Sequence, residues 1–243
     1  MEQKELFTDY LDVFKREVVS QLFSLKIYSK TITLLGGPST SGKTITCLHF
    51  ADYCVNNNKS VCYFDTDNHP VVNRPDPNLL ADFSKKNKDK YKKYFKYSTS
   101  FSEDIALKTM DDYKPSLLII DSIYTPFYNK IQSNPRGRAR AIRKFLMNLR
   151  EKIQKYNSAV IITSQVTKEL SKDEGMIYTI LGGEGLKHSS DCKWMIEFTS
   201  DKGKGDSSNS KNMGKRVMVI DKQQEVTLTI EYGGKINKLK WEN

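Results

Sequence analysis

One glycine-rich segment of the sequence carries the residue types and the spacing that hold phosphate groups. Residues 37–44 read Gly-Pro-Ser-Thr-Ser-Gly-Lys-Thr. Glycine lets the backbone wrap closely, so that its amide groups point toward phosphate oxygens. A lysine followed by a threonine closes the segment, and this pair suits contact with a terminal phosphate and with a divalent ion. The segment therefore predicts a site for ATP and Mg²⁺.

The pattern assigns a role to each part of this loop. Lys43 is expected to reach the β- and γ-phosphates, and the hydroxyl of Thr44 is expected to bind magnesium. A helical pattern begins at Lys43, and the positive end of that helix adds to the attraction for phosphate. The alternative is a chance match in a glycine turn, but an apolar strand pattern precedes the loop as the chemistry requires. The predicted nucleotide-binding residues are Gly37, Pro38, Ser39, Thr40, Ser41, Gly42, Lys43 and Thr44.

Two polar residues end apolar runs that resemble buried strands. Asp121 closes the run 117–120, and a carboxylate at that position can hold magnesium through water. Gln165 follows the run 159–164, where a side-chain amide can sense the γ-phosphate and relay its loss to the next loop. For Asp121 the alternative is an ordinary cap or turn residue after a strand. For Gln165 the alternative is a polar residue that merely ends its strand.

A further carboxylate, Asp67, follows the predicted strand 60–65. A carboxylate at that point can orient and deprotonate the water that attacks a phosphate. Asp65 is the local competitor for this role, and a solvated turn residue is the alternative. The predicted catalytic residues are Lys43, Asp67 and Gln165. The predicted metal ligands are Thr44 and Asp121.

Alternating strand and helix patterns must position these residues. This alternation is typical of an α/β fold with a mainly parallel, twisted sheet flanked by helices. Residues 125–137 contain prolines, asparagine and glycine and are expected to form a loop. The expected strands are 31–35, 60–65, 94–98, 117–121 and 159–164. The expected helices are 43–56, 79–93, 103–112 and 139–156.

The two ends of the chain have a different character. Apolar residues at helical spacing predict an amphipathic helix over residues 3–25, so that residues 1–30 form an N-terminal helical segment and 31–243 one core domain. After residue 166 the strand patterns follow one another without helices, which predicts antiparallel pairs at the C-terminal edge of the sheet. These strands are 193–199, 216–220 and 226–231, with a hairpin loop at 201–215.

The charge balance favours a polyanionic partner. The chain has 39 Lys and Arg residues against 29 Asp and Glu residues, a formal net charge of +10. Such an excess attracts nucleic acid or an acidic membrane face, and a well-solvated, lysine-rich surface is the alternative. No apolar run reaches the ~20 residues of a membrane helix. The four cysteines form no Cys-x-x-Cys pair, so we expect no zinc site and a reducing, cytoplasmic setting.

Several of these segments together resemble the RecA-like recombinases, and they look closest to the archaeal RadA and RadB branch and its shorter paralogs. The phosphate loop alone is common to many families. Its combination with the strand that ends at Asp121 and with the Thr-Ser-Gln-Val segment is much more specific. The segments that carry the resemblance are 37–44, 64–67, 117–122, 161–166, 181–188 and 215–221.

The resemblance implies a RecA-like ATPase core that acts on DNA, often as an assembly with ATP at a subunit boundary. By position, Asp67 falls where the family usually has a catalytic glutamate, and Arg74 falls near a recurrent arginine. Gln165 matches the glutamine that couples phosphate to a DNA-binding loop. The shorter aspartate favours slow hydrolysis, and we find neither a helix-hairpin-helix domain before the core nor a clear Phe-x-x-Ala tether. These departures favour a paralog or accessory factor over the main strand-exchange enzyme.

Two predicted loops offer cations to DNA. The first spans 125–140 and the second 167–183. Arginine suits bidentate contact with phosphate, and such contacts give salt-dependent binding with little sequence preference. The alternative is a solvated helix face, and the lysine-rich run 85–96 is a weaker candidate of the same kind. The predicted DNA-binding residues are Arg136, Arg138, Arg140, Lys168 and Lys172.

These residues favour a DNA-dependent ATPase of recombinational repair that binds single-stranded DNA. Its expected partners include a main recombinase or another repair protein, and a homo-oligomer fits the resemblance. The alternative is a regulatory nucleotide switch of low ATPase activity that acts through a protein partner. A small-molecule P-loop kinase is a third possibility, but the antiparallel C-terminal strands offer no arginine-bearing lid.

Overall fold

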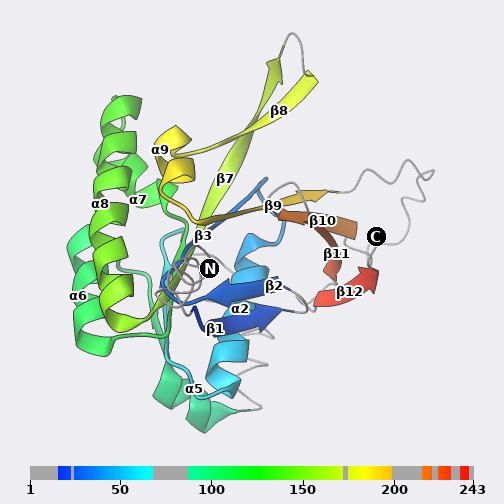
Figure 1. Cartoon of the computed structure of the whole chain (residues 1–243). Helices are drawn as coiled ribbons and strands as arrows, with labels where there is room; N and C mark the ends of the chain where they lie inside the picture. Colours follow the sequence, from blue (N-terminus) through cyan, green and yellow to red (C-terminus); the bar gives the residue numbers. More distant parts are fainter. Residues whose placement is uncertain are drawn as a thin grey trace, which may run out of the picture.

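A twisted, mainly parallel β-sheet with helices on both faces forms the centre of the chain (Figure 1). This architecture confirms the predicted α/β class with its helix-flanked sheet and its antiparallel C-terminal strands. The structure is a computed structural model. It describes residues 16–22, 25–67, 87–171, 175–198, 215–220, 224–230 and 236–240.

The main sheet combines a parallel part with an antiparallel edge. Its strands are β3 (Ile32–Gly37), β4 (Val61–Asp65), β5 (Phe95–Ser98), β6 (Leu117–Asp121), β7 (Ala159–Ser171), β9 (Cys192–Phe198), β10 (Lys215–Ile220), β11 (Gln224–Ile230) and β12 (Ile236–Lys240). The strand order is β12-β11-β10-β9-β3-β7-β6-β4-β5. From β9 to β5 all neighbours are parallel, and β10, β11 and β12 extend the sheet beyond β9 with antiparallel pairs. The sequence did not predict β12.

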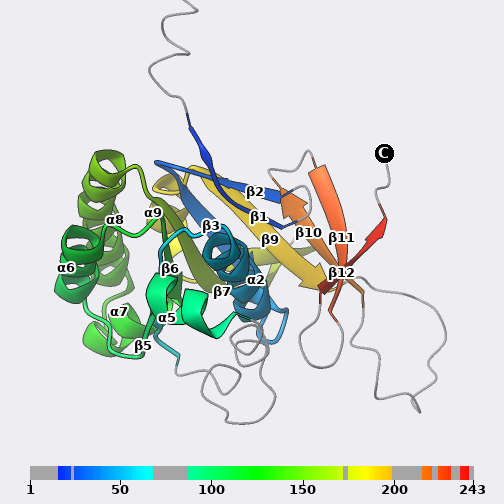
Figure 2. The same cartoon turned by 90° about the horizontal axis from the view of Figure 1, so that it is seen from below.

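The described helices cover the two faces of the sheet separately (Figure 2). They are α2 (Lys43–Asn56), α5 (Lys88–Tyr94), α6 (Glu103–Tyr113), α7 (Tyr124–Lys130), α8 (Pro135–Tyr156) and α9 (Gly183–His188). One hydrophobic cluster joins the sheet to α2 and α5, and a second joins it to α6, α7, α8 and α9. Within the described part of the chain, each helix is too short or too polar to cross a bilayer.

The central strand β6 shows why the sheet lies between two helical layers. Leu117 and Ile119 belong to the cluster on the α2 side. Leu118 and Ile120 belong to the cluster on the α6 and α8 side. All four side chains are fully buried, because successive residues of a strand point to opposite faces and helices cover both. A continuous apolar run therefore becomes a central strand, and the carboxylate of Asp121 follows at its end.

The N-terminal segment corrects the prediction of a helix. Val18–Leu22 and Leu25–Tyr28 form strands β1 and β2, which pair as an antiparallel hairpin. In β2 the side chains alternate strictly between buried and exposed, and this period of two suits a strand. Residues 1–15 lie outside the described residues, so the helix remains a prediction there and is wrong from residue 18 onward.

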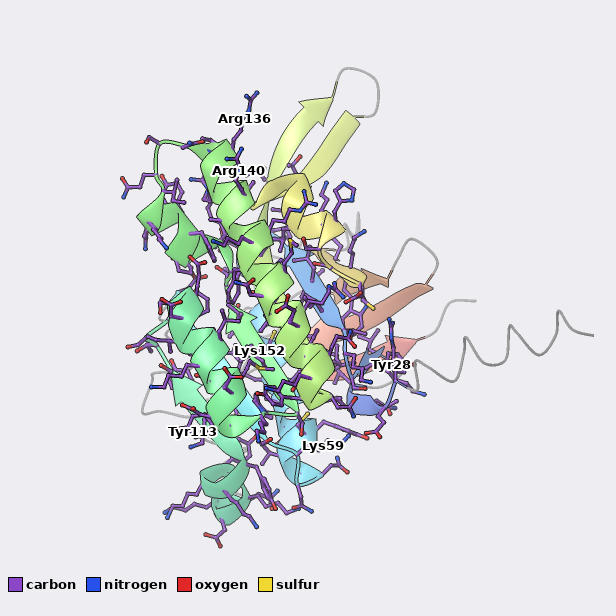
Figure 3. The ribbon with its side chains drawn as sticks, turned by 60° about the vertical axis from the view of Figure 1, so that its left-hand side comes forward. Tyr28, Lys59, Tyr113, Arg136, Arg140 and Lys152 are labelled. Carbon is purple, nitrogen blue, oxygen red and sulfur yellow. The ribbon has the colours of Figure 1, made fainter. Side chains whose placement is uncertain are left out.

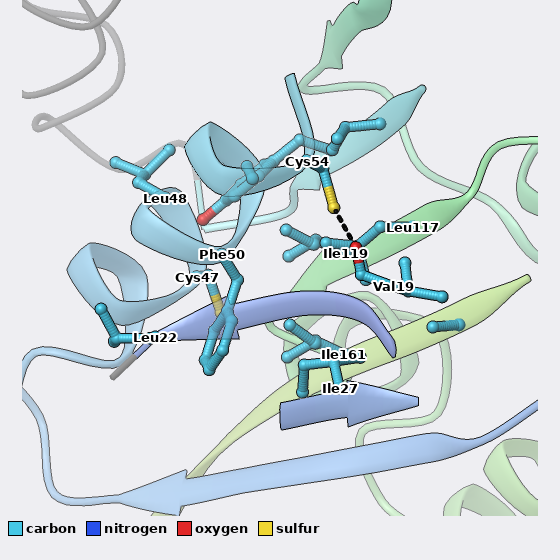
Figure 4. Close-up of a cluster of buried hydrophobic side chains, with 14 of the residues drawn as sticks. Val19, Leu22, Ile27, Cys47, Leu48, Phe50, Cys54, Leu117, Ile119 and Ile161 are labelled. Carbon is cyan, nitrogen blue, oxygen red and sulfur yellow. Dashed lines mark hydrogen bonds between the residues drawn. The ribbon is translucent and has the colours of Figure 1, made fainter. Parts of the chain in front are cut away.

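The hairpin is anchored on α2 by packing and by polar contacts. Val19 and Ile27 join the buried cluster around Phe50 and Cys54 (Figure 4). The thiol of Cys54 donates to the carbonyl of Val19 at 3.4 Å, and the hydroxyl of Ser20 donates to the carbonyl of Phe50 at 2.7 Å. The described part of the N-terminal segment thus shares the core of the sheet, while the predicted domain boundary at residue 30 stays a prediction.

Two predicted loops contain regular structure. The segment 125–137 holds α7 and the start of α8, which begins at Pro135 rather than near residue 139. Asn134 caps α8 by accepting from the amide of Gly137 at 2.8 Å, and proline is well suited to the first helical position because its missing N–H has no partner there. In the described part of the segment 167–183, β7 continues to Ser171 and pairs antiparallel with β8 (Gly175–Ile180) as a hairpin. Figure 1 shows this hairpin projecting from the sheet.

Candidate functional site

The predicted site residues meet where parallel strands end. In the sheet register, Gly37 of β3 pairs with Gln165 of β7, and Asp65 of β4 pairs with Asp121 of β6. Since β7 also pairs with β6, these strands present their carboxyl ends side by side. This edge of an open α/β sheet is the usual place for a ligand. The sheet order therefore brings the phosphate loop, Asp121 and Gln165 to one place.

The glycine-rich loop turns back between β3 and α2. Gly42 is the N-cap of α2 with a φ of 99°, a conformation that costs glycine little. A Cβ at Gly37 would lie 2.6 Å from the hydroxyl of Ser41 and 2.7 Å from the backbone oxygen of Ile196. The loop therefore has no room for a side chain at its first glycine.

Lys43 lies inside this loop and is only 8% exposed. Its ammonium donates to the carbonyl of Gly37 at 2.9 Å and to the carbonyl of Pro38 at 2.7 Å. Burial lowers the pKa of Lys43, and the negative charge of Asp121, with a smaller contribution from Asp67, acts in the opposite direction. The loop thus holds a cation at its centre, within electrostatic reach of two carboxylates.

Asp121 is a buried carboxylate with two hydroxyl donors. It is 5% exposed and accepts from the hydroxyl of Tyr63 at 2.7 Å and from the hydroxyl of Thr163. Burial, followed by the charge of Asp121, raises the pKa of Tyr63, so its phenol stays a donor. Neither partner was predicted from the sequence. The available signal was a polar side chain at a buried position on each strand that neighbours β6.

Asp67 is exposed and lies beside the end of β6. Its carboxylate accepts from the hydroxyl of Ser122 at 3.2 Å. Thr66 ties the same segments together, since its hydroxyl donates to the carbonyl of Ser122 at 2.5 Å and accepts from the amide of Ser122 at 2.8 Å. Asp65, by contrast, is buried and accepts from the hydroxyl of Tyr97 at 2.8 Å. An accessible carboxylate suits contact with water, so this arrangement favours Asp67 over Asp65 as the base.

Gln165 lies at the base of the projecting β7–β8 hairpin. Its side chain is exposed, and its carbonyl accepts from the amide of Leu181 at 2.9 Å. The hydroxyl of the preceding Ser164 donates to the carbonyl of Leu181 at 2.6 Å. Gln165 therefore lies on β7 where this strand pairs with the end of β3 and accepts from the residue that follows β8.

The residues of the loop fit a triphosphate with magnesium. Among the described residues, the hydroxyl of Ser41 is buried without a hydrogen-bond partner, and Lys43 is held by carbonyls of the loop itself. Thr44 is half-buried at the start of α2. The donor set consists of a hydroxyl, an ammonium and a helix N-terminus, which suits phosphate, and the nearby carboxylate of Asp121 suits a hard cation.

The structure separates the predicted DNA-binding residues. Arg136 and Arg140 are exposed and lie on the N-terminal part of α8, at the end of the molecule from which the hairpin projects (Figure 3). Arg138 departs from the prediction, because it is only 8% exposed and its guanidinium donates to the carbonyl of Ile131 at 2.9 Å. Lys168 lies on β7, but its side chain falls outside the described residues, as do the whole of Lys172 and Arg74.

Comparison with known proteins identifies the family of the chain and a solved structure with the same fold. The family model described as Rad51 matches residues 17–234. The chain belongs to the Rad51 family. The fold of this Rad51-family chain is that of the crystal structure of the RadB recombinase, with a TM-score of 0.61 at 19% identity over 88% of this chain and 93% of the other.

Two curated archaeal proteins are also similar to this Rad51-family chain. Each is named DNA repair and recombination protein RadB. The protein of Methanococcus maripaludis is 29% identical over 156 residues, which cover 61% of this chain and 70% of the relative. The protein of Methanosphaera stadtmanae is 27% identical over 176 residues, which cover 70% and 74%. These findings confirm the resemblance to RecA-like recombinases and to their RadB branch.

The crowding at Gly37 gives a direct test of the loop. We predict that Gly37→Ala abolishes nucleotide binding or destabilises the fold, because backbone and Ser41 atoms occupy the space of the new methyl group. Gly36→Ala is the matched control, since the nearest atoms around Gly36 belong to the flexible end of Met195, at 3.1 Å. Thermal unfolding and binding of a fluorescent ATP analogue measure both effects. Equal behaviour of the two variants would contradict the geometry of the loop.

Proposed function

We propose that the chain is an ATPase that acts on DNA in recombination or repair, as a paralog or accessory factor of a main recombinase. One observation carries the ATPase part: the buried Asp121, held by two hydroxyls, lies at the same sheet edge as the lysine of a closed phosphate loop. Members of the Rad51 family are ATPases that bind ATP with magnesium. The residues of the chain fit both groups.

The roles of the residues follow from their positions. The amides of the loop 37–44 would hold the phosphates, and Lys43 would exchange its bonds to Gly37 and Pro38 for bonds to the β- and γ-phosphates. Thr44 and Asp121 would hold the magnesium ion, Asp121 through water. The ion, when bound, neutralises charge on the phosphate oxygens.

Asp67 is the proposed general base. Its carboxylate accepts from the hydroxyl of Ser122 at 3.2 Å. Ser122 directly follows the proposed magnesium ligand Asp121. Asp67 would accept a proton from the attacking water. Aspartate is one methylene shorter than glutamate, so the water lies farther from an ideal position and turnover is slow.

DNA is the proposed polyanion. The support is the net charge of +10, the exposed Arg136 and Arg140 on α8, and the similarity to two proteins named DNA repair and recombination protein RadB. Lys168, on β7, and Lys172, which lies outside the described residues, complete the proposed contact set. Arginine and lysine contacts to phosphate give salt-dependent binding with little sequence preference, and single-stranded DNA is the proposed substrate.

A nucleotide switch that acts through a protein partner is the second candidate function. The exposed Asp67, in the position where the resemblance places a glutamate, favours it. In this case Gln165 and the hairpin would report the bound nucleotide to the partner, and hydrolysis would only reset the switch. A main recombinase is the proposed partner.

ATPase activity in a titration of single-stranded DNA tests the proposed function. We predict that DNA stimulates the wild type and that Lys43→Ala abolishes turnover, because the phosphates lose their buried cation. Lys108→Ala, which removes an exposed lysine of α6, is the control for charge. Turnover in Lys43→Ala at the wild-type rate would remove the site assignment. Equal rates with and without DNA, together with no DNA binding at low salt, would favour the switch.

The salt dependence of DNA binding tests the cations of α8. We predict that Arg136→Ala together with Arg140→Ala lowers the slope of log affinity against log salt by about 1.5, since about 0.7 to 0.9 counterions are released for each phosphate contact. Lys92→Ala together with Lys93→Ala removes the same charge from the exposed surface of α5 and serves as the control. A larger slope change in the α5 variant would place the DNA on the lysine-rich run instead.

A further inference from the structure

One arginine of α8 is enclosed, although it lies between two exposed arginines. Arg138 is 8% exposed, whereas Arg136 and Arg140 are exposed. A buried guanidinium is stable only where several groups compensate for its lost hydration. Its surroundings therefore indicate what it holds together.

Arg138 joins α7 to the turn before α8. Its guanidinium donates to the carbonyl of Ile131 at 2.9 Å and to the carbonyl of Gln132 at 3.4 Å. The same group lies 5.0 Å from the ring centroid of Tyr124 and 5.1 Å from that of Tyr128. These distances are those of cation–π contacts, which gain strength when water is excluded.

The aromatic partners of Arg138 form one surface. Tyr124 and Tyr128 are four residues apart on α7, which places their side chains on the same face of the helix. Their rings are stacked, with centroids 5.5 Å apart and an interplanar angle of 28°. Arg138 therefore contacts both the face of α7 that carries the two rings and the backbone carbonyls of the turn after α7.

The other end of α7 is tied to the candidate nucleotide site. Only Ile123 separates α7 from Ser122, and the amide of Ile123 donates to the carbonyl of Thr163 at 3.0 Å. The hydroxyls of Ser122 and Thr125 lie 3.3 Å apart, and that of Ser122 donates to Asp67. Contacts thus run without a break from the end of β6 through α7 to the first turn of α8.

We propose that Arg138 is a positioning residue that locks the first turn of α8 onto α7 and so couples Arg136 and Arg140 to the nucleotide site. The identity of the two ligands, ATP and DNA, rests on the proposed function. The lock itself rests on the contacts of Arg138. In this proposal Arg138 relays the nucleotide state to α8 and contacts neither ligand.

The chemistry of the lock requires arginine rather than any cation. A guanidinium is planar, stacks on aromatic rings and presents several N–H groups in fixed directions. A lysine keeps the charge but cannot contact both rings and both carbonyls in this way. Arg138→Lys therefore removes the lock while it preserves the net charge.

Hydrogen exchange, read by mass spectrometry on the full chain, tests the lock. Wild type, Arg138→Lys, Tyr128→Phe and Tyr128→Leu are compared with and without a non-hydrolysable ATP analogue and magnesium. The peptide of interest spans residues 123–140. Affinity for the analogue and for a thymidine oligonucleotide is measured in parallel, and thermal unfolding confirms that each variant is folded.

We expect the analogue to slow exchange of this peptide in the wild type and in Tyr128→Phe, which retains the aromatic ring. In Arg138→Lys and Tyr128→Leu the effect should disappear, while affinity for the analogue stays within about twofold. Affinity for the oligonucleotide should fall by about tenfold in both, although Arg138→Lys keeps the charge and Tyr128→Leu changes none.

Two results would overturn the proposal. One is an unchanged nucleotide effect on exchange in Arg138→Lys, or the absence of this effect in the wild type. The other is weak oligonucleotide binding by Arg138→Lys with normal binding by Tyr128→Leu, which would make Arg138 a direct contact. If the wild type fails to bind the oligonucleotide at low salt, the DNA part of the proposed function fails, and the exchange data alone decide on the lock.

Discussion

A buried carboxylate at the end of β6 is the constraint on which the rest of the site depends. Asp121 is 5% exposed and is held by the hydroxyls of Tyr63 and Thr163. A buried carboxylate needs hydrogen-bond donors or cations around it. The two hydroxyls satisfy part of this need, and the charge of Lys43 acts on the same group. A divalent ion held beside Asp121 would satisfy the remainder, so the proposed magnesium site compensates for the cost of burial.

The order of the strands makes this arrangement possible. β6 lies between β4 and β7, so Tyr63 and Thr163 approach Asp121 from the two neighbouring strands. On the far side of β7 lies β3, whose end opens into the phosphate loop. The same edge continues through α7 to the start of α8 and, separately, into the β7–β8 hairpin. The start of α8 and the hairpin segment carry the candidate DNA contacts. A change at the nucleotide therefore has short, contiguous routes to both.

The phosphate loop, β6 and α2 could be predicted because their signals are local: a glycine spacing, an apolar run and a helical pattern. The partners of Asp121 could not, because they depend on which strands become neighbours. The burial of Arg138 could not be predicted for a similar reason, because its aromatic partners belong to α7. The prolines and asparagines of 125–137 indicated a loop in place of this helix. At the N-terminus, a helical spacing competed with the strand pattern of β1 and β2, and packing of the hairpin on α2 decided in favour of strands.

The magnesium dependence of nucleotide affinity tests the central claim most directly. Isothermal titration with a non-hydrolysable ATP analogue is performed with magnesium and with EDTA on the wild type and on Asp121→Asn, with Asp111→Asn as a control at a carboxylate on α6, away from the sheet edge. The account predicts that removal of magnesium weakens binding by about tenfold or more in the wild type and in the control, and has little effect in Asp121→Asn. The same magnesium dependence in all three proteins would contradict it.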